Sequence, residues 1–405
     1  MSSHPWLYPI FHCRGYRVTK VQTDEQRLLL YVEPQPHKVC CPQCGSREVI
    51  RRGQTVRWLR NLPVGGDCTW LIATLPRVEC RECRIVRQIR PGLAEERRTY
   101  TRAFARYVLE LCRYMTIKDV AVHLGVSWDI VKDIQKQHLV RHYARPSLKQ
   151  VRQIAIDEIC VGRGYRFLTL VLDLESGAVL FVGQGKKADS LRPFWRRLRA
   201  AKAKIKAVAI DMSPAYQKAV RKHLPKATLV FDRFHVVKLL NHKLTQLRRQ
   251  LYRQVTDDLK KQVLKGTRWL LLKNPENLDP VKGEPRRLRE ALRLNEPLAT
   301  AYYLKEDLRQ IWEQLGKFPA RMKLLDWYHQ AMASGIRALQ EFARTLLIHA
   351  DGILAWYDYP ISTGPLEGTN NKIKTMNRQH YGLRDGEFFT LKLYQLHEAK
   401  YALVG

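Results

Sequence analysis

The sequence predicts a multidomain protein whose largest part is an α/β unit with a mixed β-sheet. Three observations lead to this prediction. Between residues 151 and 232, apolar runs typical of strands alternate with helical patterns in the order β-β-β-α-β-α-β. Residues 236–350 are almost wholly helical by pattern. Two Cys-x-x-Cys pairs lie in a β-rich stretch before residue 95, and short helices follow them.

The net charge gives the first indication of function. The chain has 405 residues, 45% of them apolar, with 71 Lys and Arg against 38 Asp and Glu, so its net charge is +33 at pH 7. This composition excludes a mostly disordered chain, and the length indicates several domains. Because such an excess of charge repels itself in a compact protein, we expect nucleic acid as a neutralising partner. A basic surface kept for solubility and an anionic membrane surface are the alternatives.

The chain shows no membrane or export signal. The longest apolar run, residues 167–182, is broken by Asp173 and Glu175 and falls short of the roughly 18 apolar residues of a membrane span. The N-terminus lacks a basic stretch followed by an apolar one, so we expect no signal peptide and no membrane partner. We therefore expect a cytoplasmic protein, in which nine cysteines are metal ligands or core thiols rather than disulfides.

The first predicted domain, residues 1–95, is a β-rich module that binds one structural Zn²⁺. Structural zinc prefers four tetrahedral ligands, and each Cys-x-x-Cys turn presents two thiolates. The separation between the pairs, residues 45–79, exceeds the usual roughly 15–20 residues, which a hairpin insertion would explain. Cys40 leaves the register open, and buried free thiols are the alternative. The predicted ligands are Cys41, Cys44, Cys80 and Cys83.

Residues 96–145 are predicted to contain a helix-turn-helix. Thr116 is placed to cap one short helix, Gly125 forms a turn, and Ser127 caps a second helix with apolar residues on one face. The second helix of such a motif enters the DNA major groove. An ordinary helical hairpin is the alternative, but the net charge favours DNA binding. The residues expected near DNA at the start of this helix are Ser127, Trp128, Asp129 and Lys132.

A linker at Arg145-Pro146-Ser147 precedes the α/β unit, which we assign to residues 150–235 and 355–405, interrupted by a helical insertion at 236–354. A three-strand meander followed by alternating α and β elements is the order of the ribonuclease H-like fold, in which the first and fourth strands are neighbours. The predicted strands are 151–161, 165–174, 178–184, 205–211 and 227–232, and the predicted helices are 189–200 and 214–223.

Three carboxylates are positioned for chemistry in this fold. Asp157 and Asp211 follow apolar runs in the first and fourth strands, and Glu367 lies in the first turn of a helix that Pro365 begins. Carboxylates that converge repel one another unless they bind cations, so we expect two Mg²⁺ or Mn²⁺ ions. Taken singly, each acid is better explained as a cap or a solvated residue, and it is their joint placement in this fold that favours a catalytic role. Glu158 points to the opposite face of its strand and is the weaker candidate.

Four motifs connect these acids to a known family. They are Ala155-Ile-Asp157-Glu158, Ala209-Ile-Asp211-Met-Ser213-Pro-Ala-Tyr216, Phe231-Asp232-Arg-Phe-His235-Val-Val-Lys238 and Gly364-Pro-Leu-Glu367-Gly-Thr-Asn370-Asn371-Lys-Ile-Lys374, with Arg378 and Gly382. Together they resemble the catalytic domain of the ISL-three family of insertion-sequence transposases. The cysteine pairs and the helix-turn-helix occupy the positions of that family's zinc finger and helix-turn-helix. The resemblance covers nearly the whole chain, although residues 236–350 match only in position and helical character.

The resemblance implies a DDE transposase with a ribonuclease H-like core and assigns its catalytic triad to Asp157, Asp211 and Glu367. The pair Asp232 and His235 resembles a D-x-x-H element of several transposase groups and is an accessory candidate; a strand-end Asp and a helix-capping His are the alternative. Four residues on one face of the Glu367 helix are expected to hold DNA phosphates. They are Asn370, Asn371, Lys374 and Arg378.

We therefore predict a bacterial or archaeal transposase, associated with the nucleoid. Its zinc module and helix-turn-helix would bind the terminal inverted repeats of the element. Its core would hydrolyse a phosphodiester at each end and use the freed 3′-hydroxyl to attack target DNA. A homodimer on DNA is expected because two ends are handled together. A domesticated, non-catalytic DNA-binding regulator and a structure-specific ribonuclease H-like nuclease are the alternatives.

Overall fold

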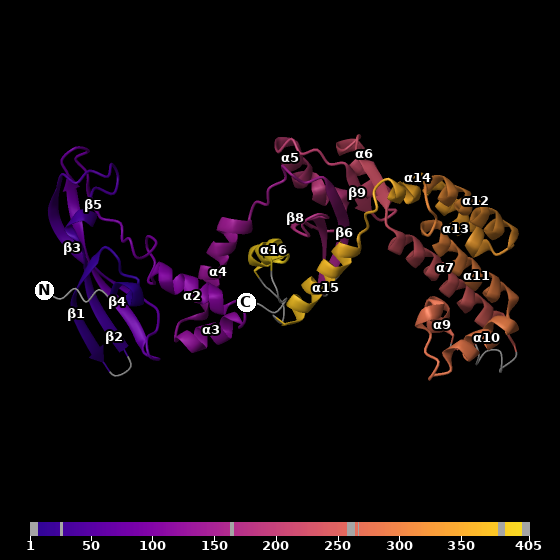
Figure 1. The fold of residues 1–405 in the computed structure, drawn as a ribbon, viewed down its shortest axis with the longest axis horizontal. Helices are drawn as coiled ribbons and strands as arrows, with labels where there is room; N and C mark the ends of the chain where they lie inside the picture. The colour runs from indigo at the N-terminus through magenta and orange to yellow at the C-terminus, as the bar shows by residue number, and fades with distance from the viewer. Residues whose placement is uncertain are drawn as a thin grey trace. The chain divides into compact units, whose positions relative to one another are not determined.

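The computed structural model describes residues 7–24, 27–162, 166–256, 264–265, 267–379 and 385–398, so Gly382 of the family motif lies outside the described residues. The chain divides into two compact units (Figure 1), and the boundary between them falls at Ala144 and Arg145, at the predicted linker. In the part of the chain described, no helix combines the length and the apolar character that a membrane span requires.

A five-stranded sheet forms the first part of the N-terminal unit. Its strand order is β1-β2-β4-β3, with β5 paired to β4. Leu71, Ala73 and Leu75 alternate along β4 and bury one face of the sheet, as the two-residue period of a strand requires. The antiparallel β3–β4 hairpin lies between the cysteine pairs, which confirms the predicted insertion. The elements are α1 Leu7–Phe11, β1 Tyr16–Asp24, β2 Arg27–Pro34, β3 Val49–Arg60, β4 Cys68–Cys80 and β5 Val86–Gln88.

Three helices complete this unit and contain the predicted helix-turn-helix. The Thr116 hydroxyl accepts a hydrogen bond from the Asp119 N–H and caps α3, and the Ser127 hydroxyl accepts one from the Ile130 N–H and caps α4. Gly125 ends α3 in the left-handed region, at φ 59°, where glycine is favoured. These caps and this turn confirm the motif. The helices are α2 Arg102–Leu111, α3 Ile117–Leu124 and α4 Trp128–Tyr143.

A buried arginine connects the sheet to the helix-turn-helix. Arg60, at the end of β3, is only 4% exposed, and its Nη2 donates hydrogen bonds to the Leu124 carbonyl (2.9 Å) and to Cys68 Sγ (2.9 Å). The Leu124 carbonyl ends α3, where the helix dipole favours a cation. The Thr101 hydroxyl, which caps α2, also donates to the buried Asn61 side chain at 2.8 Å. The zinc-binding sheet and the helices therefore form one packed body.

The C-terminal unit is built on a second five-stranded sheet with the order β10-β9-β6-β7-β8. The strands β6, β7 and β8 form an antiparallel meander, whereas β9 pairs in parallel with both β6 and β10. This mixed ribonuclease H-like sheet confirms the predicted element order and the predicted neighbourhood of the first and fourth strands. The elements are β6 Gln153–Gly162, β7 Arg166–Asp173, β8 Val179–Gln184, α5 Arg192–Ala200, β9 Ala207–Ile210, α6 Pro214–His223 and β10 Thr228–Phe231.

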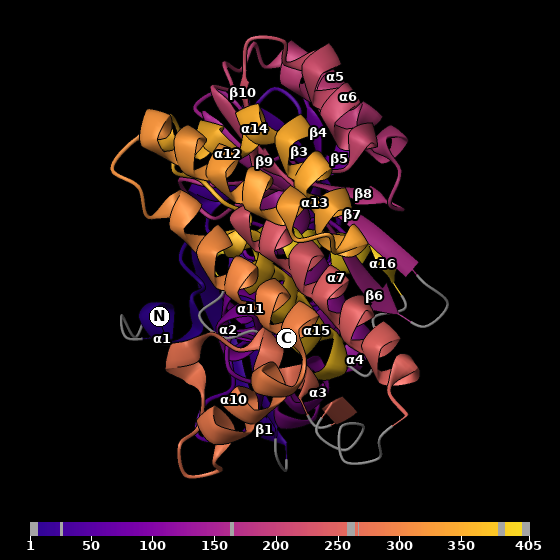
Figure 2. The ribbon, with the colours of Figure 1, turned by 90° about the vertical axis from the view of Figure 1, so that its right-hand side faces the viewer.

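A helical region follows β10, and Figure 2 shows its long helices α7, α11, α12 and α13 side by side. Trp327 is fully buried in this region, where its Nε1 donates to the Leu304 carbonyl at 2.7 Å. Gly352 brings α14 against β10 so closely that a Cβ there would lie 2.4 Å from the Phe231 ring. The helices are α7 Arg233–Gln254, α9 Arg268–Leu272, α10 Glu284–Leu294, α11 Glu296–Arg309, α12 Lys317–Ala333, α13 Arg337–Ile348 and α14 Ala350–Leu354.

The last two helices return to the sheet. Helix α15, Gly364–Gln379, packs beside β6, where the Asn377 side chain donates to the Val161 carbonyl at 2.7 Å (Figure 1). Helix α16, Gly386–Gln395, packs on β8. The apolar side of α15 explains this placement, because Leu366, Ile373 and Met376 are buried at helical spacing. The return of α15 to β6 brings residues near the end of the chain to the strand that contains Asp157.

Candidate zinc and acidic sites

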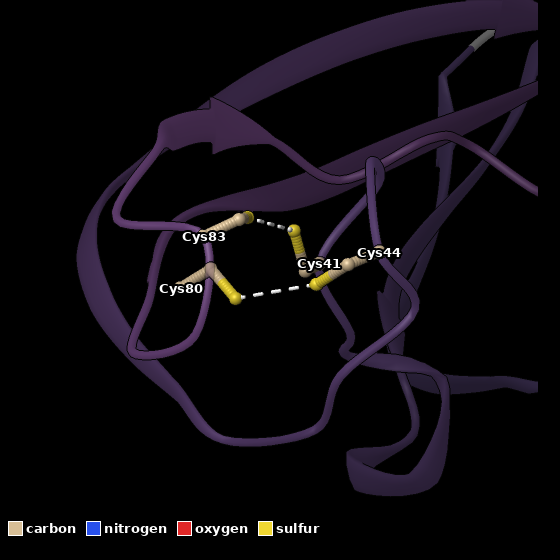
Figure 3. A group of neighbouring side chains, drawn as sticks. All are labelled: Cys41, Cys44, Cys80 and Cys83. Carbon is tan, nitrogen blue, oxygen red and sulfur yellow. Dashed lines mark hydrogen bonds between the residues drawn. The ribbon is translucent and has the colours of Figure 1, made fainter.

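Four cysteines gather at one end of the N-terminal sheet (Figure 3). Cys41 Sγ lies 3.5 Å from Cys83 Sγ, and Cys44 Sγ lies 3.4 Å from Cys80 Sγ. All four sulfurs lie within 4.8 Å of one another. Sulfurs bound tetrahedrally to one zinc at 2.3 Å would be about 3.8 Å apart, so the cluster has the dimensions of a structural zinc site. Cys40 is not part of it, which resolves the register in favour of Cys41.

Local backbone geometry holds these cysteines together. The Gly45 N–H donates to the Cys41 carbonyl at 3.0 Å, and Gly45 adopts φ 79°, which closes the first turn. The backbone N–H of Cys44 lowers the pKa of the Cys41 thiol to about 6, with a further contribution from Gln43, although burial opposes the shift. In the same turn, a backbone hydrogen bond at Ser46 lowers the pKa of Cys44, but the hydrogen bond with the Cys80 thiol and burial outweigh it and raise this pKa to about 12. The thiols therefore share protons, which zinc would displace on binding.

The predicted DNA-contacting residues lie at the exposed start of α4. Ser127, Trp128 and Asp129 are exposed, and the Ser127 hydroxyl caps the helix. Lys132 places its Nζ 5.1 Å from the centre of the Trp128 ring. A cation and an aromatic ring therefore lie together at the N-terminal end of α4, the helix that such motifs insert into the major groove.

Asp157 lies on β6, and Asp211 follows directly after the neighbouring parallel strand β9. The last paired residues of the two strands, Ala155 and Ala209, each lie two positions before one of these acids. One Asp211 oxygen accepts the Ser213 N–H at 3.0 Å. Burial raises the pKa of Asp157, and the charge of Asp211 raises it further, whereas His235 and Lys238 oppose the shift. The two carboxylates therefore interact electrostatically, as acids that share a site do.

Helix α15 completes this acidic site from the other side. Asn370 Nδ2 donates to Asp157 Oδ2 at 3.2 Å, and Asn370 Oδ1 is buried with no hydrogen-bond partner among the described residues. Glu367 lies one turn earlier on the same helix and is exposed. Among the residues that the structure describes, the four cysteines form a group whose ligand atoms all lie within 4.8 Å of one another, and the three acids form no such group. The strands and helix that contain Asp157, Asp211 and Glu367 are neighbours, but the three carboxylates do not lie close enough together to share one metal ion.

Asp232 and His235 join the acidic site to α15. Asp232 is 2% exposed and accepts hydrogen bonds from the Thr363 hydroxyl (2.7 Å) and from His235 Nδ1 (3.1 Å). Burial would raise the pKa of Asp232, but the bonds from His235 and Thr363 outweigh it and lower this pKa. The bond to Asp232 raises the pKa of His235 despite burial, and Asp157 adds to the rise. An imidazolium is therefore favoured beside the acids.

The remaining predicted residues of α15 separate into two groups. Asn371, Lys374 and Arg378 are exposed and continue the stripe that begins at Glu367, as spacings of four, seven and eleven residues require. Asn370 lies at the edge of this stripe and is buried against Asp157 instead. The structure therefore gives Asn370 a contact within the acidic site that the helical spacing alone did not indicate.

Glu158 belongs to a separate network on the other face of β6. Tyr216 donates its hydroxyl proton to Glu158 Oε1 at 2.7 Å, and the same hydroxyl lies 3.2 Å from Thr169 Oγ1. Burial raises the pKa of Glu158, and the Tyr216 hydrogen bond opposes this rise. Sequence reasoning missed the roles of Tyr216 and Thr363 as partners of acids. In the sequence, Tyr216 could be noticed only as the last residue of the Asp211 motif, and Thr363 only as a hydroxyl residue just before α15.

The site has the donors that a divalent cation prefers. Mg²⁺ and Mn²⁺ bind carboxylate and amide oxygens. Asp157 and Asp211 present carboxylate oxygens on adjacent strands, and Asn370 adds a buried amide oxygen that no described residue bonds. A buried oxygen of this kind normally has a partner. The residues therefore fit a divalent metal centre.

Comparison with known proteins identifies the chain. Residues 154–393 match the family model of the ISL3 DDE transposases, described as "Transposase". Residues 91–139 match the helix-turn-helix domain of transposase family ISL3, and residues 37–83 match the zinc-finger of transposase IS204/IS1001/IS1096/IS1165. The fold, the zinc site and these matches define a DDE DNA transposase with a structural zinc site and a DNA-binding helix-turn-helix.

The chain belongs to the ISL3 family of transposases. It is 34% identical to the transposase for insertion sequence element IS1001 of Bordetella parapertussis, over 94% of this chain and 95% of that protein. It is 27% identical to the transposase for IS1557 of Mycobacterium tuberculosis, over 89% and 86% of the two chains. Among solved structures, the Drosophila P element transposase strand transfer complex matches with a TM-score of 0.40 and 11% identity, over 75% of this chain and 93% of that chain.

Proposed function

We propose that this transposase binds the terminal inverted repeats of its insertion sequence and catalyses DNA strand cleavage and strand transfer at Asp157, Asp211 and Glu367. The observation that supports this most directly is the parallel register of β6 and β9, whose last pair, Ala155 and Ala209, lies two residues before Asp157 and Asp211. The hydrogen bond from Asn370 to Asp157 holds α15, the helix that contains Glu367, beside Asp157. The three acids therefore come from the elements that a ribonuclease H-like active site requires.

The three carboxylates would hold two Mg²⁺ or Mn²⁺ ions, with Asn370 Oδ1 available as a further oxygen. Such ions activate the attacking water or 3′-hydroxyl and stabilise the leaving oxygen of the phosphodiester. Asp232 acts as a positioning residue, because it holds Thr363, whose carbonyl accepts the Glu367 N–H at 3.0 Å. The bond to Asp232 raises the pKa of His235, which favours a positive charge near Asp157 and Asp211.

DNA is held by surfaces on both units. In the N-terminal unit, the zinc-binding module of residues 1–95 and the helix-turn-helix of 96–145 recognise the repeat, the latter through Ser127, Trp128 and Lys132. In the C-terminal unit, residues 150–235 and 355–405 form the catalytic domain and residues 236–354 the insertion domain. Here Asn371, Lys374 and Arg378 bind phosphates beside the acids. A homodimer joins the two ends, and the protein acts in the prokaryotic cytoplasm, associated with the nucleoid.

The test combines a cleavage assay with three acid variants. The substrate is a labelled duplex with the DNA that flanks the gene, incubated with Mg²⁺ and either the unaltered protein or Asp157→Asn, Asp211→Asn or Glu367→Gln. Each variant is expected to lower cleavage on the order of 10³-fold, because metal-assisted charge stabilisation is worth several kcal/mol. Binding to the repeat should persist, since the recognition helix belongs to the N-terminal unit.

The matched control is Glu175→Gln, an exposed carboxylate in the β7–β8 turn at the opposite edge of the sheet. It should cleave normally. Normal cleavage by any of the three acid variants would contradict the triad. Tight binding without cleavage under any metal would favour a DNA-binding regulator, and cleavage without joined products would favour a nuclease.

A further inference from the structure

A pocket lies at the same edge of the sheet as the acidic site. Strands β6, β8 and β9 run in one direction, because β7 is antiparallel to both β6 and β8 and β9 is parallel to β6. The segment that follows β8 therefore emerges at the edge where Asp211 follows β9. This segment and β7 form a pocket of about 520 Å³. Its lining residues are Phe167, Gln184, Gly185, Lys186, Lys187, Asp189 and Ser190.

The pocket combines positive charge with an aromatic ring. Lys186 and Lys187 are exposed, and Lys186 Nζ lies 4.9 Å from the centre of the Phe167 ring. The carboxylate of Asp189 is paired with Arg192 at 3.0 Å, so its charge does not oppose the lysines. An aromatic face beside ammonium groups is the combination that binds single-stranded nucleic acid, with the base on the ring and the phosphate on the cation.

The wall of the pocket is fixed by hydrogen bonds that continue to the active-site strand. Thr169 Oγ1 donates to the Gly185 carbonyl at 2.8 Å and accepts from the Ser190 hydroxyl at 2.9 Å. The Tyr216 hydroxyl lies 3.2 Å from Thr169 Oγ1 and donates to Glu158, the residue next to Asp157. At Gly183 a Cβ would lie 2.9 Å from the Ser190 carbonyl, so only glycine lets this segment pack so closely. The pocket therefore lies at the same end of the strands as the acids, on the face of β6 that holds Glu158 rather than Asp157, and Tyr216, which feels the charge of Asp211, contacts its wall at the Lys186 carbonyl.

We propose that this pocket binds one unpaired nucleotide of the DNA strand next to the phosphodiester that the acids cleave. The inference rests on the proposed function, because it needs DNA at the acidic site. Phe167 stacks on the base, and Lys186 and Lys187 bind the adjoining phosphate. A base inside a duplex is excluded, because the neighbouring base pairs of the stack cover the faces on which Phe167 would stack. The pocket volume lies within the range of roughly 300–1,000 Å³ typical of small-ligand sites.

The test measures binding without divalent metal, so that no cleavage occurs. Two duplexes contain the same repeat end, but in one the nucleotides beside the cleavage position are unpaired and include the fluorescent base 2-aminopurine. The unaltered protein should bind the unpaired DNA more tightly and quench the fluorescence. Phe167→Leu should weaken binding to this DNA by about tenfold, a typical effect of losing one base–aromatic stack, and leave the paired duplex unchanged. Phe167→Tyr, which keeps the ring, should restore the preference.

The charge variant Lys186→Gln/Lys187→Gln should also lose the preference. Its control is Lys204→Gln/Lys226→Gln, which removes the same charge just before β9 and β10, at the opposite edge of the sheet. Equal losses in both double variants would show a general effect of charge and overturn the proposal. No preference for unpaired DNA, or an unchanged preference in Phe167→Leu, would also overturn it. Because cleavage is assayed separately, an inactive protein with an intact preference would reject only the proposed function.

Discussion

The two candidate metal centres of this protein are assembled in different ways. The four cysteine sulfurs lie within 4.8 Å of one another, and their positions are set by two turns at the end of one hairpin. The acids Asp157, Asp211 and Glu367 come from two strands and a helix more than 150 residues further along the chain. Among the described side chains, these three do not form such a compact group.

Electrostatics explains this difference. Thiols are neutral when protonated and can share protons, so sulfurs crowd together without repulsion until zinc displaces the protons. Carboxylates are charged at neutral pH, and the pKa of Asp157 is raised mainly by burial, with repulsion from Asp211 adding to the rise. Repulsion between Asp157 and Asp211 is what a bound cation would relieve in the acidic site, whereas protonated thiols have no such repulsion.

The largest effect is expected in the cysteine cluster. Cys41→Ser removes one of four ligands, so the protein should lose its zinc, about one ion per chain, and the N-terminal sheet should unfold. DNA binding should be lost with it, because Arg60 ties this sheet to α3. Metal analysis and circular dichroism measure the two losses.

Cys40→Ser is a close control, because Cys40 is the neighbouring cysteine, is half-buried and lies outside the cluster. It should keep both zinc and fold. If Cys41→Ser kept as much zinc as Cys40→Ser, Cys41 would not be a ligand. If the unaltered protein held no zinc either, the cluster would be a set of free thiols and the contrast between the two centres would disappear.

A smaller effect is expected where α15 is held to the acidic site. Asp232→Asn removes the charge that His235 and Thr363 share, so cleavage should fall by about 10–100-fold, as is usual for residues that orient metal ligands. Repeat binding should remain. The pKa of His235 should also fall, because the bond to Asp232 is the main cause of its rise. NMR titration of His235 measures this shift, which a purely structural defect would not produce.

Thr363 provides the matched pair for this prediction. Thr363→Val removes the hydroxyl that donates to Asp232, whereas Thr363→Ser keeps it. Combined with Asp232→Asn, the valine variant should add little further loss, because both changes break the same bond. Fully additive losses, or equal activity of the valine and serine variants, would show that this bond does not position Glu367.

The sequence was sufficient where the determinants are local. The two helix caps at Thr116 and Ser127 and the left-handed Gly125 each follow from a residue and its near neighbours, and the structure confirms all three. The ribonuclease H-like sheet followed from element order, which restricts the pairing of β6 with β9. The zinc ligands followed from spacing.

What the sequence did not reveal depends on contacts between distant segments. Asn370 bonds Asp157 across 213 residues, and Thr363 bonds Asp232 across 131 residues. Helical spacing placed Asn370 with the residues expected to face phosphates. Spacing tells which residues share a face of α15, but it does not tell which side of that face packs against β6. Such partners are defined only when the insertion has folded and returned α15 to the sheet.

The smallest expected effect tests the electrostatic explanation itself. Asp157→Asn removes a half-buried carboxylate but retains an oxygen that can accept the Asn370 bond. Without divalent metal, the variant should be more stable than the unaltered protein at pH 7, by roughly 0.5–2 kcal/mol, although it is inactive. Calorimetry on the full chain, following the transition that Cys41→Ser leaves intact, measures this difference.

The pH dependence gives the sign of this effect. Burial raises the pKa of Asp157 above its unfolded value, so the native state holds a proton that the unfolded state has already lost. The protein should therefore lose stability as pH rises from the unfolded pKa through the raised folded pKa, and Asp157→Asn should lack this loss. Adding Mg²⁺ should stabilise the unaltered protein and not the variant. A variant with the same pH profile, or one less stable at pH 7, would show that repulsion between acids does not separate this centre from the cysteine cluster.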